Sequence, residues 1–158
     1  MKYKRYVKKC EEFSICGEVG EANLILAEHS MERRTLYQIV ISGSGKVGRP
    51  FESEFKVLDS LDNNFVNLKE YLQDHTIFHS NEPFHIYGFN TLTKDVDWDG
   101  RLVRQSFNCD LPNSYLICFD GSPVVNGKVL QRLDYAKLEQ KLYDVDINDG
   151  IIGVFTRI

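Results

Sequence analysis

The chain has 158 residues and a formal net charge of -4, and 42% of its residues are hydrophobic. This length and composition are those of one globular domain, so we expect a single domain over residues 1–158. The acidic balance argues against a general nucleic-acid binder or a protein of anionic membranes, because both need a basic field. No apolar run approaches the length of about 20 residues that a membrane helix requires. The charged start lacks the apolar core of a secretory signal, and we therefore expect a cytoplasmic location.

The cysteines and the first residues give two further expectations. Cys10, Cys16, Cys109 and Cys118 show no C-x-x-C spacing, which argues against a zinc knuckle and favours reduced thiols. Alanine is scarce and Asn, Asp, Lys, Phe and Tyr are plentiful, a bias typical of an AT-rich genome such as that of a virus. The start of the chain is basic, and we interpret it as a solvated first strand; its cations are Lys2, Lys4, Arg5, Lys8 and Lys9.

Apolar and aromatic runs predict many short strands in chain order. The run over 36–41, rich in β-branched and aromatic residues, predicts a buried strand. Gly43 and Gly45 then predict a turn, and Lys46 begins a return strand, so that 36–47 is expected to be a hairpin. Further strands are expected over 23–27, 55–58, 96–98, 102–107, 115–119, 124–130 and 151–158, and the stretch 77–89 is expected to be two aromatic strands around a turn at Asn81–Pro83.

Helical content is expected to be small. The stretch Phe65–Leu72 places apolar residues at helical spacing and predicts one short helix. Turn residues recur along the chain, as all-β sandwiches and barrels require. They are Asp99-Gly100, Pro112-Asn113, Asp120-Gly121, Asn126-Gly127 and Asp149-Gly150. The fold class is therefore all-β, a jelly-roll barrel with one or two short helices.

Three segments of the first half recur in order in the second half. ISGSGKVG from Ile41 resembles FDGSPVVNG from Phe119, and KVLDSLD from Lys56 resembles KVLQRLD from Lys128. NLKEYLQD over 67–74 likewise resembles KLEQKLYD over 137–144. Two interpretations stay open: a duplicated half-barrel, giving two fused halves, or repeated use of the same turn chemistry.

Two short motifs match functional signatures only in part. Gly43 to Gly48 fits G-x-G-x-x-G, but Arg49-Pro50 follows instead of the helix that a dinucleotide site needs. Asp95-x-Asp97-x-Asp99-Gly100 copies half of a calcium loop, but position twelve is Ser106 where a bidentate Glu belongs. We interpret both segments as turns.

The histidines resemble part of a metal-binding pattern. Val40 to Gly45 matches the V-L-x-G-x-G hairpin of the cupins, the RmlC-like jelly rolls. On that pattern, His29 falls near the first metal ligand and His85, after Pro83, near the last. The position of the second His falls near Met31 and that of the Glu near Leu36 or Thr35, so two of the four expected ligands are missing. We therefore predict no bound metal and no cofactor.

A closer resemblance is to the HutD/Ves-type cupins, whose halves are fused and whose metal site is generally absent. Glu32 to Leu36, followed by Gly43-Ser44-Gly45, resembles that family's Asp-Arg-x-Leu and Gly-x-Gly segments. Glu82 to Gly88 resembles its Pro-Phe-x-Phe-x-Gly segment, and Asp99 to Asn108 resembles its Asp-Gly and Asp-Phe-Asn segments. The resemblance implies a cupin fold but no particular reaction.

Three classes of function compete. The first is a binding protein that holds a small polar or anionic, nucleotide- or sugar-like molecule in the barrel mouth. The second is a metal-independent sugar-nucleotide epimerase or isomerase, with a His base and a Tyr acid. The third is a structural or virion interaction protein that assembles through its sheet faces, and we expect a homo-oligomer such as a homodimer. We favour binding over catalysis, without nucleic-acid or membrane partners, and expect the ligand at His29, Tyr37, His79, His85, Tyr87, Arg104 and Asn108.

Arg104 provides the reason to consider an anion. If its strand face points inward, the guanidinium is buried and needs a negative partner, which a bound anion would supply. The alternative, which we favour slightly, is that Arg104 faces solvent and pairs with an exposed Asp.

Overall fold

The computed structural model describes residues 3–29, 34–48, 53–56, 65–67, 75–93, 96–139 and 141–158. Every regular element within these residues is a β-strand, and the strands form four antiparallel sheets. The chain divides into two compact units, Met1–Asp95 and Val96–Ile158. Whether the whole chain behaves as one domain stays a prediction.

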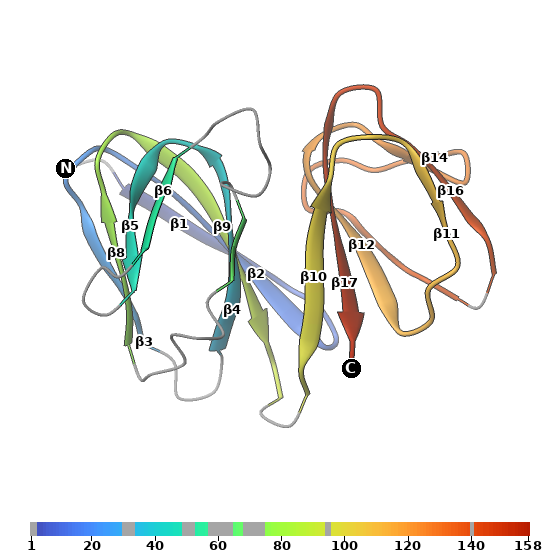
Figure 1. Ribbon diagram of the computed structural model, residues 1–158, viewed down its shortest axis with the longest axis horizontal. Coiled ribbons are helices and arrows are strands. Elements are labelled where there is room, and N and C mark those ends of the chain that lie inside the picture. The colour runs from blue at the N-terminus through green and yellow to red at the C-terminus, as the bar shows by residue number, and fades with distance from the viewer. Residues whose placement is uncertain are drawn as a thin grey trace. The chain divides into compact units, whose positions relative to one another are not determined.

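The first unit contains two sheets (Figure 1). Sheet A has the order β1-β2-β9-β4-β7, and sheet B has the order β3-β8-β5-β6. Their strands are β1 (Tyr3–Lys9), β2 (Phe13–Gly20), β3 (Ile25–His29), β4 (Arg34–Ser42), β5 (Ser44–Gly48), β6 (Ser53–Lys56), β7 (Phe65–Asn67), β8 (His75–Ser80) and β9 (Phe84–Thr91).

The second unit also contains two sheets (Figure 1). Sheet C has the order β10-β17-β12-β15, and sheet D has the order β11-β16-β13-β14. Their strands are β10 (Trp98–Val103), β11 (Phe107–Cys109), β12 (Ser114–Gly121), β13 (Val124–Val125), β14 (Lys128–Val129), β15 (Tyr135–Lys137), β16 (Tyr143–Asp146) and β17 (Gly150–Arg157).

The two units repeat one topology. Subtracting eight from each strand label turns sheet C into β2-β9-β4-β7 and sheet D into β3-β8-β5-β6, which are the orders in the first unit. Among the described strands, only β1 has no counterpart. Each unit therefore carries the pair of sheets of a whole jelly roll, so the repeated unit is larger than the half-barrel considered in one of the two open interpretations of the sequence.

The recurring sequence segments occupy equivalent places in the two units. Gly43 at the end of β4 has a φ of 99°, and Gly121 at the end of β12 has a φ of 76°. Lys56 ends β6 and Lys128 begins β14, while the third pair of segments begins at the ends of β7 and β15. Equivalence extends to an irregularity, since the register shifts between Val40 and Ser42 in one unit and between Cys118 and Asp120 in the other. The shared topology therefore favours duplication over chance reuse of turns.

The expected hairpin over 36–47 is wrong. Both strands exist, but β4 pairs with β7 and β9 in sheet A, whereas β5 pairs with β6 and β8 in sheet B. The chain changes sheet at Gly43, where an added Cβ would lie 2.7 Å from the Cα atom of Phe84. Only glycine combines this positive φ with so close a backbone approach. The glycine turn is thus a corner between sheets.

Two smaller expectations also change. Phe65–Asn67, placed in a short helix by the sequence pattern, is strand β7 because it pairs with Tyr37 to Ile39 at the edge of sheet A. The remainder of that helix, 68–72, lies outside the described residues. Asp99-Gly100, expected to form a turn, lies inside β10 and pairs with Phe155 and Thr156. The three other dipeptides that end in Gly do have a glycine with positive φ.

The core of the second unit lies between its two sheets and is apolar. Side chains from sheet C and from sheet D meet there in one cluster, so these faces of the two sheets are the inner ones. Its buried members are Cys109, Leu116, Cys118, Val125, Leu130, Leu138, Tyr143, Val145, Ile147, Ile152 and Val154.

The inner face of sheet A follows from one contact in the first unit. Gly20 pairs with Phe84 in sheet A, and a Cβ on Gly20 would lie 2.7 Å from Cδ1 of Leu24. The Leu24 amide donates to Oγ of Ser80, which ends β8 in sheet B. Gly20 therefore faces sheet B, as do the β2 residues that alternate with it.

Candidate functional site

The inner face of sheet A is polar. Side chains alternate across a strand, so the residues that share the Gly20 face are known from the register. Several are buried and able to form hydrogen bonds: Ser14, Cys16, Glu18, Thr35, Gln38 and Asn90. The opposite face of the same strands carries Phe13, Ile15, Tyr37, Ile39, Tyr87 and Phe89, none more than 2% exposed.

One end of this polar face is occupied by an internal network. The Thr35 hydroxyl donates to Oδ1 of Asn90, and Nδ2 of Asn90 donates to the Ser14 carbonyl at 3.4 Å and its hydroxyl at 3.3 Å. These three side chains satisfy one another, and they hold β4, β9 and β2 together across the sheet.

Glu18 forms the second polar group of the inner face. Its side chain is only 5% exposed, and Oε2 accepts a hydrogen bond of 2.8 Å from the Tyr3 hydroxyl. Burial, and then the bond to the Glu18 carboxylate, raise the pKa of Tyr3 above its ordinary range. Cys16 lies beside Glu18, with its sulfur 3.8 Å from Oε1, and accepts a contact of 3.0 Å from Nε of Arg5. Strand β1 therefore supplies partners for both groups.

Gln38 differs from the other polar residues of this face. It is 5% exposed, and its Oε1 atom is buried without a hydrogen-bond partner. It is the one such atom among the side chains that the structure describes. A buried acceptor left unpaired costs about 1–3 kcal/mol, so its presence needs an explanation.

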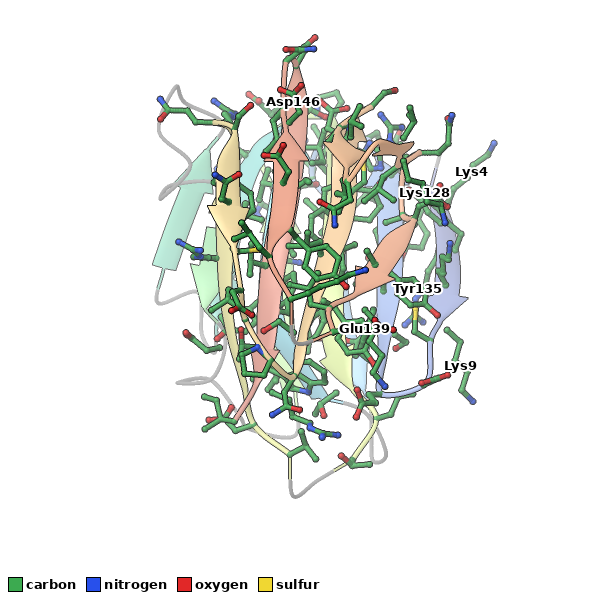
Figure 2. All side chains as sticks on the ribbon, turned by 90° about the vertical axis from the view of Figure 1, so that its right-hand side faces the viewer. Lys4, Lys9, Lys128, Tyr135, Glu139 and Asp146 are labelled. Atoms are coloured by element: carbon green, nitrogen blue, oxygen red, sulfur yellow. The ribbon has the colours of Figure 1, made fainter. Side chains whose placement is uncertain are left out.

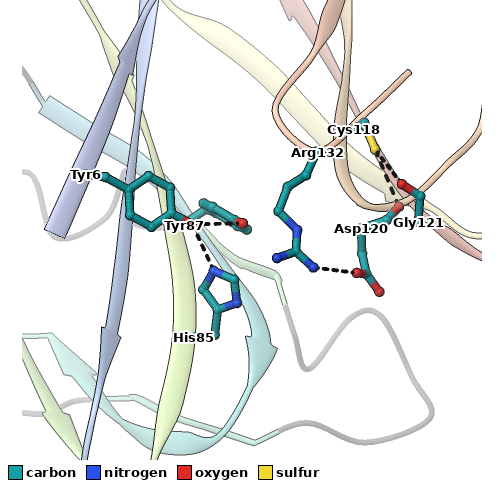
Figure 3. Close-up of polar contacts among 7 residues, drawn as sticks. All are labelled: Tyr6, His85, Tyr87, Cys118, Asp120, Gly121 and Arg132. Atoms are coloured by element: carbon teal, nitrogen blue, oxygen red, sulfur yellow. Dashed lines mark hydrogen bonds and ion pairs between the residues drawn. The ribbon is translucent and has the colours of Figure 1, made fainter. Parts of the chain in front are cut away.

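A separate polar cluster lies on the other face of sheet A. The Tyr6 hydroxyl is 3.0 Å from Nε2 of His85 and 3.0 Å from the Tyr87 hydroxyl, as Figure 3 shows. The His85 and Tyr87 rings lie with their centroids 4.8 Å apart. The Tyr6 ring passes over Gly17, where a Cβ would lie 2.3 Å from Cζ of Tyr6. His85 and Tyr87 thus lie together, but on the outer face of sheet A and not on the inner face where a ligand in the barrel mouth was expected. Tyr6 is an addition that the sequence did not indicate.

The other expected site residues of the first unit lie at different places on its sheets. Tyr37 packs against Phe89 in the apolar face, with ring centroids 6.4 Å apart. His79 lies on β8 in sheet B, next to the fully buried Ser80. His29 ends β3, and its side chain lies outside the described residues.

The other two expected residues belong to the second unit. Arg104 follows the end of β10 and is exposed to solvent, as the favoured alternative for it required. Asn108 lies exposed on β11, opposite Asp144 of β16. It lines an open groove of about 360 Å³ together with Ser106, Phe107, Val145 and Asp146. Ser106 is held there by Asp146 at 3.1 Å and by the Ile147 amide at 2.8 Å.

Metal binding receives no support from the described side chains. They include no group of three or more His, Cys, Asp or Glu residues placed to hold an ion. His85, aligned with the last cupin ligand, lies on the face of β9 opposite to the inner residues Ile86 and Gly88. All four cysteines are buried and free of disulfides. Within the described residues, no helix has the length and apolarity to cross a membrane.

Gln38 was not among the expected site residues, although the sequence distinguishes it from the equivalent residue of the second unit. Gln38 is the polar residue within the apolar run LYQIVIS, and the equivalent run SYLICFD of β12 has Leu116 at that position. The registers agree, because Gln38 pairs with Gly88 and Leu116 pairs with Val154 at the same distance from the bulge. Comparing the two repeats would therefore have revealed the polar substitution.

These sheets and corners define a cupin-type jelly-roll fold in two copies. No protein-family model matches the sequence, and no curated protein matches it. Solved structures do match. YhaK from Escherichia coli aligns with a TM-score of 0.59 and 11% identity over 96% of this chain and 92% of its own.

HutD from Pseudomonas fluorescens SBW25 aligns with a TM-score of 0.51 and 13% identity, over 92% of this chain and 78% of its own. A cupin 2 conserved barrel domain protein from Leptotrichia buccalis aligns with a TM-score of 0.48 and 10% identity, over 98% of this chain and 86% of its own. The expected resemblance to cupins of the HutD type is confirmed at the level of the fold.

Proposed function

We propose that the first unit binds a small polar molecule between its two sheets, at the inner face of β2, β4 and β9. The observation that carries this proposal is the buried Oε1 atom of Gln38, which has no partner among the described residues. A ligand hydroxyl or amine that donates to Oε1 removes the desolvation cost of that atom.

The second unit indicates that the fold itself does not need this polarity. In the equivalent inner positions, Leu116 replaces Gln38 and Val103 replaces Glu18, as judged from their strand partners. Leu116 is fully buried in the apolar cluster, and Val103 packs against it. A residue that costs stability in one repeat and is replaced by a stabilising one in the other supports a functional role for Gln38.

The described inner groups favour a ligand rich in hydrogen-bond donors. Gln38 offers an acceptor, and the Glu18 carboxylate has further acceptor capacity beyond its bond to Tyr3. A polyol, a sugar-like molecule or an amine matches these acceptors better than an anion does. The cation invoked for an anionic ligand, Arg104, is exposed in the other unit.

Binding is supported over catalysis by the position of the His–Tyr cluster. A metal-independent epimerase would use His85 as a base and Tyr87 or Tyr6 as an acid. These side chains lie on the face of sheet A opposite to Gln38. A molecule held at Oε1 of Gln38 therefore lies across the sheet from the only His–Tyr pair that the described hydrogen bonds connect.

Native mass spectrometry of protein purified directly from cells tests the proposal. We expect a retained small-molecule mass in the wild-type protein, and its loss in Gln38→Leu, which copies the residue of the second unit. Gln105→Leu is the matched control, because Gln105 is exposed, and it should retain the mass. If no mass is retained, thermal-shift screening with polyols, sugars and amines is the second measurement. A protein that none of these stabilises, or a mass equally retained by Gln38→Leu, contradicts the proposal.

A further inference from the structure

Strand β1 is an addition to the repeated barrel. It has no counterpart among the described strands of the second unit, and it stands at the end of sheet A, paired on one side only with β2. Six of its seven residues are exposed and the remaining one is partly buried. Within the part of the chain that the structure describes, no strand pairs with its other edge.

Two tyrosines fix this strand, one on each face of the sheet. Tyr3 donates to the buried Glu18 on the inner face, and Tyr6 bonds to His85 and Tyr87 on the opposite face. Tyr6 fits there because Gly17 of β2 leaves room for its ring. Strand β1 is therefore held in place although it contributes little to the core, and its aromatic rings are engaged in contacts within the sheet.

Strand β1 is strongly basic, and most of its charged side chains are exposed to solvent. Its seven residues, YKRYVKK, include four cations in a chain whose net charge is -4. Lys4 and Lys9 extend outward from the ribbon of β1 in Figure 2. Lysines on an edge strand oppose its pairing with an identical edge, because like charges then face one another. The same charges attract an acidic segment.

We propose that the outer edge of β1 docks an acidic, extended segment of a partner protein, which adds to sheet A as a further strand. An unpaired edge presents backbone donors and acceptors that bond an incoming strand, and alternate side chains select its charge. The alternative of single-stranded nucleic acid needs aromatic side chains available for stacking. In β1, both tyrosines are already in contact with the sheet, and the chain as a whole is acidic.

Fluorescence anisotropy with short labelled peptides tests this proposal. The probe is a seven-residue peptide that alternates Glu and Val, compared with one that alternates Lys and Val. We expect the full-length protein to bind the Glu peptide and not the Lys peptide, with binding weakened as salt screens the exposed charges. A Glu peptide with N-methyl groups on alternate amides keeps the charge but loses the edge hydrogen bonds, and it should bind at least about tenfold more weakly.

Substitutions on the protein provide the second arm. Lys4→Gln with Lys8→Gln, two substitutions on the same face of β1, should weaken binding of the Glu peptide about tenfold, since each charge pair at the surface contributes modestly. Lys128→Gln with Lys141→Gln is the matched control, because both lysines are exposed in the second unit, and it should leave binding unchanged. Circular dichroism and thermal unfolding establish that all variants fold.

Three results would overturn the proposal. They are absence of binding to the Glu peptide by folded wild-type protein, equal effects of the two lysine pairs, and equal binding of the N-methylated peptide. Tighter binding of a labelled oligothymidine than of the Glu peptide would instead assign β1 to nucleic acid.

Discussion

In the first unit, the inner positions of β4 carry Gln38 and Val40, and in the second unit the equivalent strand β12 carries Leu116 and Cys118. Both strands end at a glycine with positive φ, and both occupy the third place of a four-strand order shared by sheets A and C. The backbone is therefore the same, while the chemistry between the sheets differs.

The two units differ in the polarity of the side chains that they bury between their sheets. The second unit buries Leu, Ile, Val and Tyr side chains between its sheets, where apolar burial stabilises a fold by about 25 cal/mol per Å². The first unit buries an unpaired amide oxygen and a carboxylate in the same place. One copy thus has an ordinary apolar core, and the other buries polar groups, of which the Gln38 amide oxygen is unpaired among the described residues and is our proposed ligand contact.

The largest change in stability is expected when the buried Leu116 of the second unit is replaced by Gln, the residue at the equivalent position of the first unit. Leu116→Gln removes a fully buried apolar side chain and buries an amide in an apolar cluster. We expect the free energy of unfolding to fall by about 3–5 kcal/mol, measured by urea denaturation.

Leu142→Gln is the control, because Leu142 is 65% exposed, and it should change the free energy of unfolding by less than about 0.5 kcal/mol. Equal, small effects of both substitutions would mean that the inner face of the second unit tolerates polar groups, and the contrast between the units would disappear.

The equivalence of the two corners is tested by substituting their glycines. In Gly121→Ala, the new Cβ lies 1.9 Å from the Asp149 carbonyl oxygen, and in Gly43→Ala it lies 2.7 Å from Cα of Phe84. Both clashes are with backbone atoms of the neighbouring strand or turn, and both glycines have a positive φ. We expect the free energy of unfolding, measured by urea denaturation, to fall by about 3 kcal/mol in Gly121→Ala and by about 2 kcal/mol in Gly43→Ala.

Gly127→Ala separates the clash from the effect of φ alone. Gly127 has a φ of 81°, but a Cβ there has no neighbour within 4 Å. Gly127→Ala should therefore lower the free energy of unfolding by only about 1 kcal/mol. If Gly127→Ala lowered the free energy of unfolding as much as Gly121→Ala, the close backbone approach would not be the reason for glycine at the two corners.

Cys118 is expected to make the free energy of unfolding fall at alkaline pH. Burial raises the pKa of its thiol to about 11. Below the ordinary thiol pKa near 9 the protonated thiol is favoured in both states, whereas above it the unfolded chain ionises first. The free energy of unfolding should therefore fall between about pH 9 and pH 11, by about 2 kcal/mol.

Cys118→Val copies the residue Val40 of the first unit and removes this thiol. We expect the variant to lose less stability than the wild type over the same pH range, as measured by urea denaturation at each pH. Ionisation of Tyr3, whose pKa is also raised, contributes in the same direction in both proteins. Parallel pH profiles for the two proteins would contradict the assigned role of Cys118.

The smallest expected effect makes the first unit resemble the second. Gln38→Leu replaces an unpaired buried acceptor by an apolar side chain. In ligand-free protein, the free energy of unfolding should rise by about 1 kcal/mol in urea denaturation. Gln105→Leu, at an exposed position, should leave it unchanged. Destabilisation by Gln38→Leu would mean that Oε1 is satisfied in the folded protein and that no ligand is needed there.

Local sequence was sufficient for many of the strands and for several turns. The run over 36–41 does form a strand, and Asn126-Gly127 does form the tight connection between β13 and β14, because β-branched residues and glycine act through the backbone nearest to them. The recurring segments also pointed to a duplication, which the strand orders support. Other segments, Glu82 to Gly88 and Asp99 to Asn108 among them, resembled those of the HutD/Ves-type cupins and indicated the fold, which the solved structures confirm.

Only the tertiary structure decided which strands pair and which side chains meet. The residues around Gly43 fit a hairpin and a corner equally well, and contact with Phe84, distant in sequence, selects the corner. Phe65–Asn67 fits a helix or a strand, and the edge of β4 selects the strand. Whether Gln38 or His85 faces the inside depends on the placement of the second sheet, because alternation along a strand defines two faces without stating which one is covered.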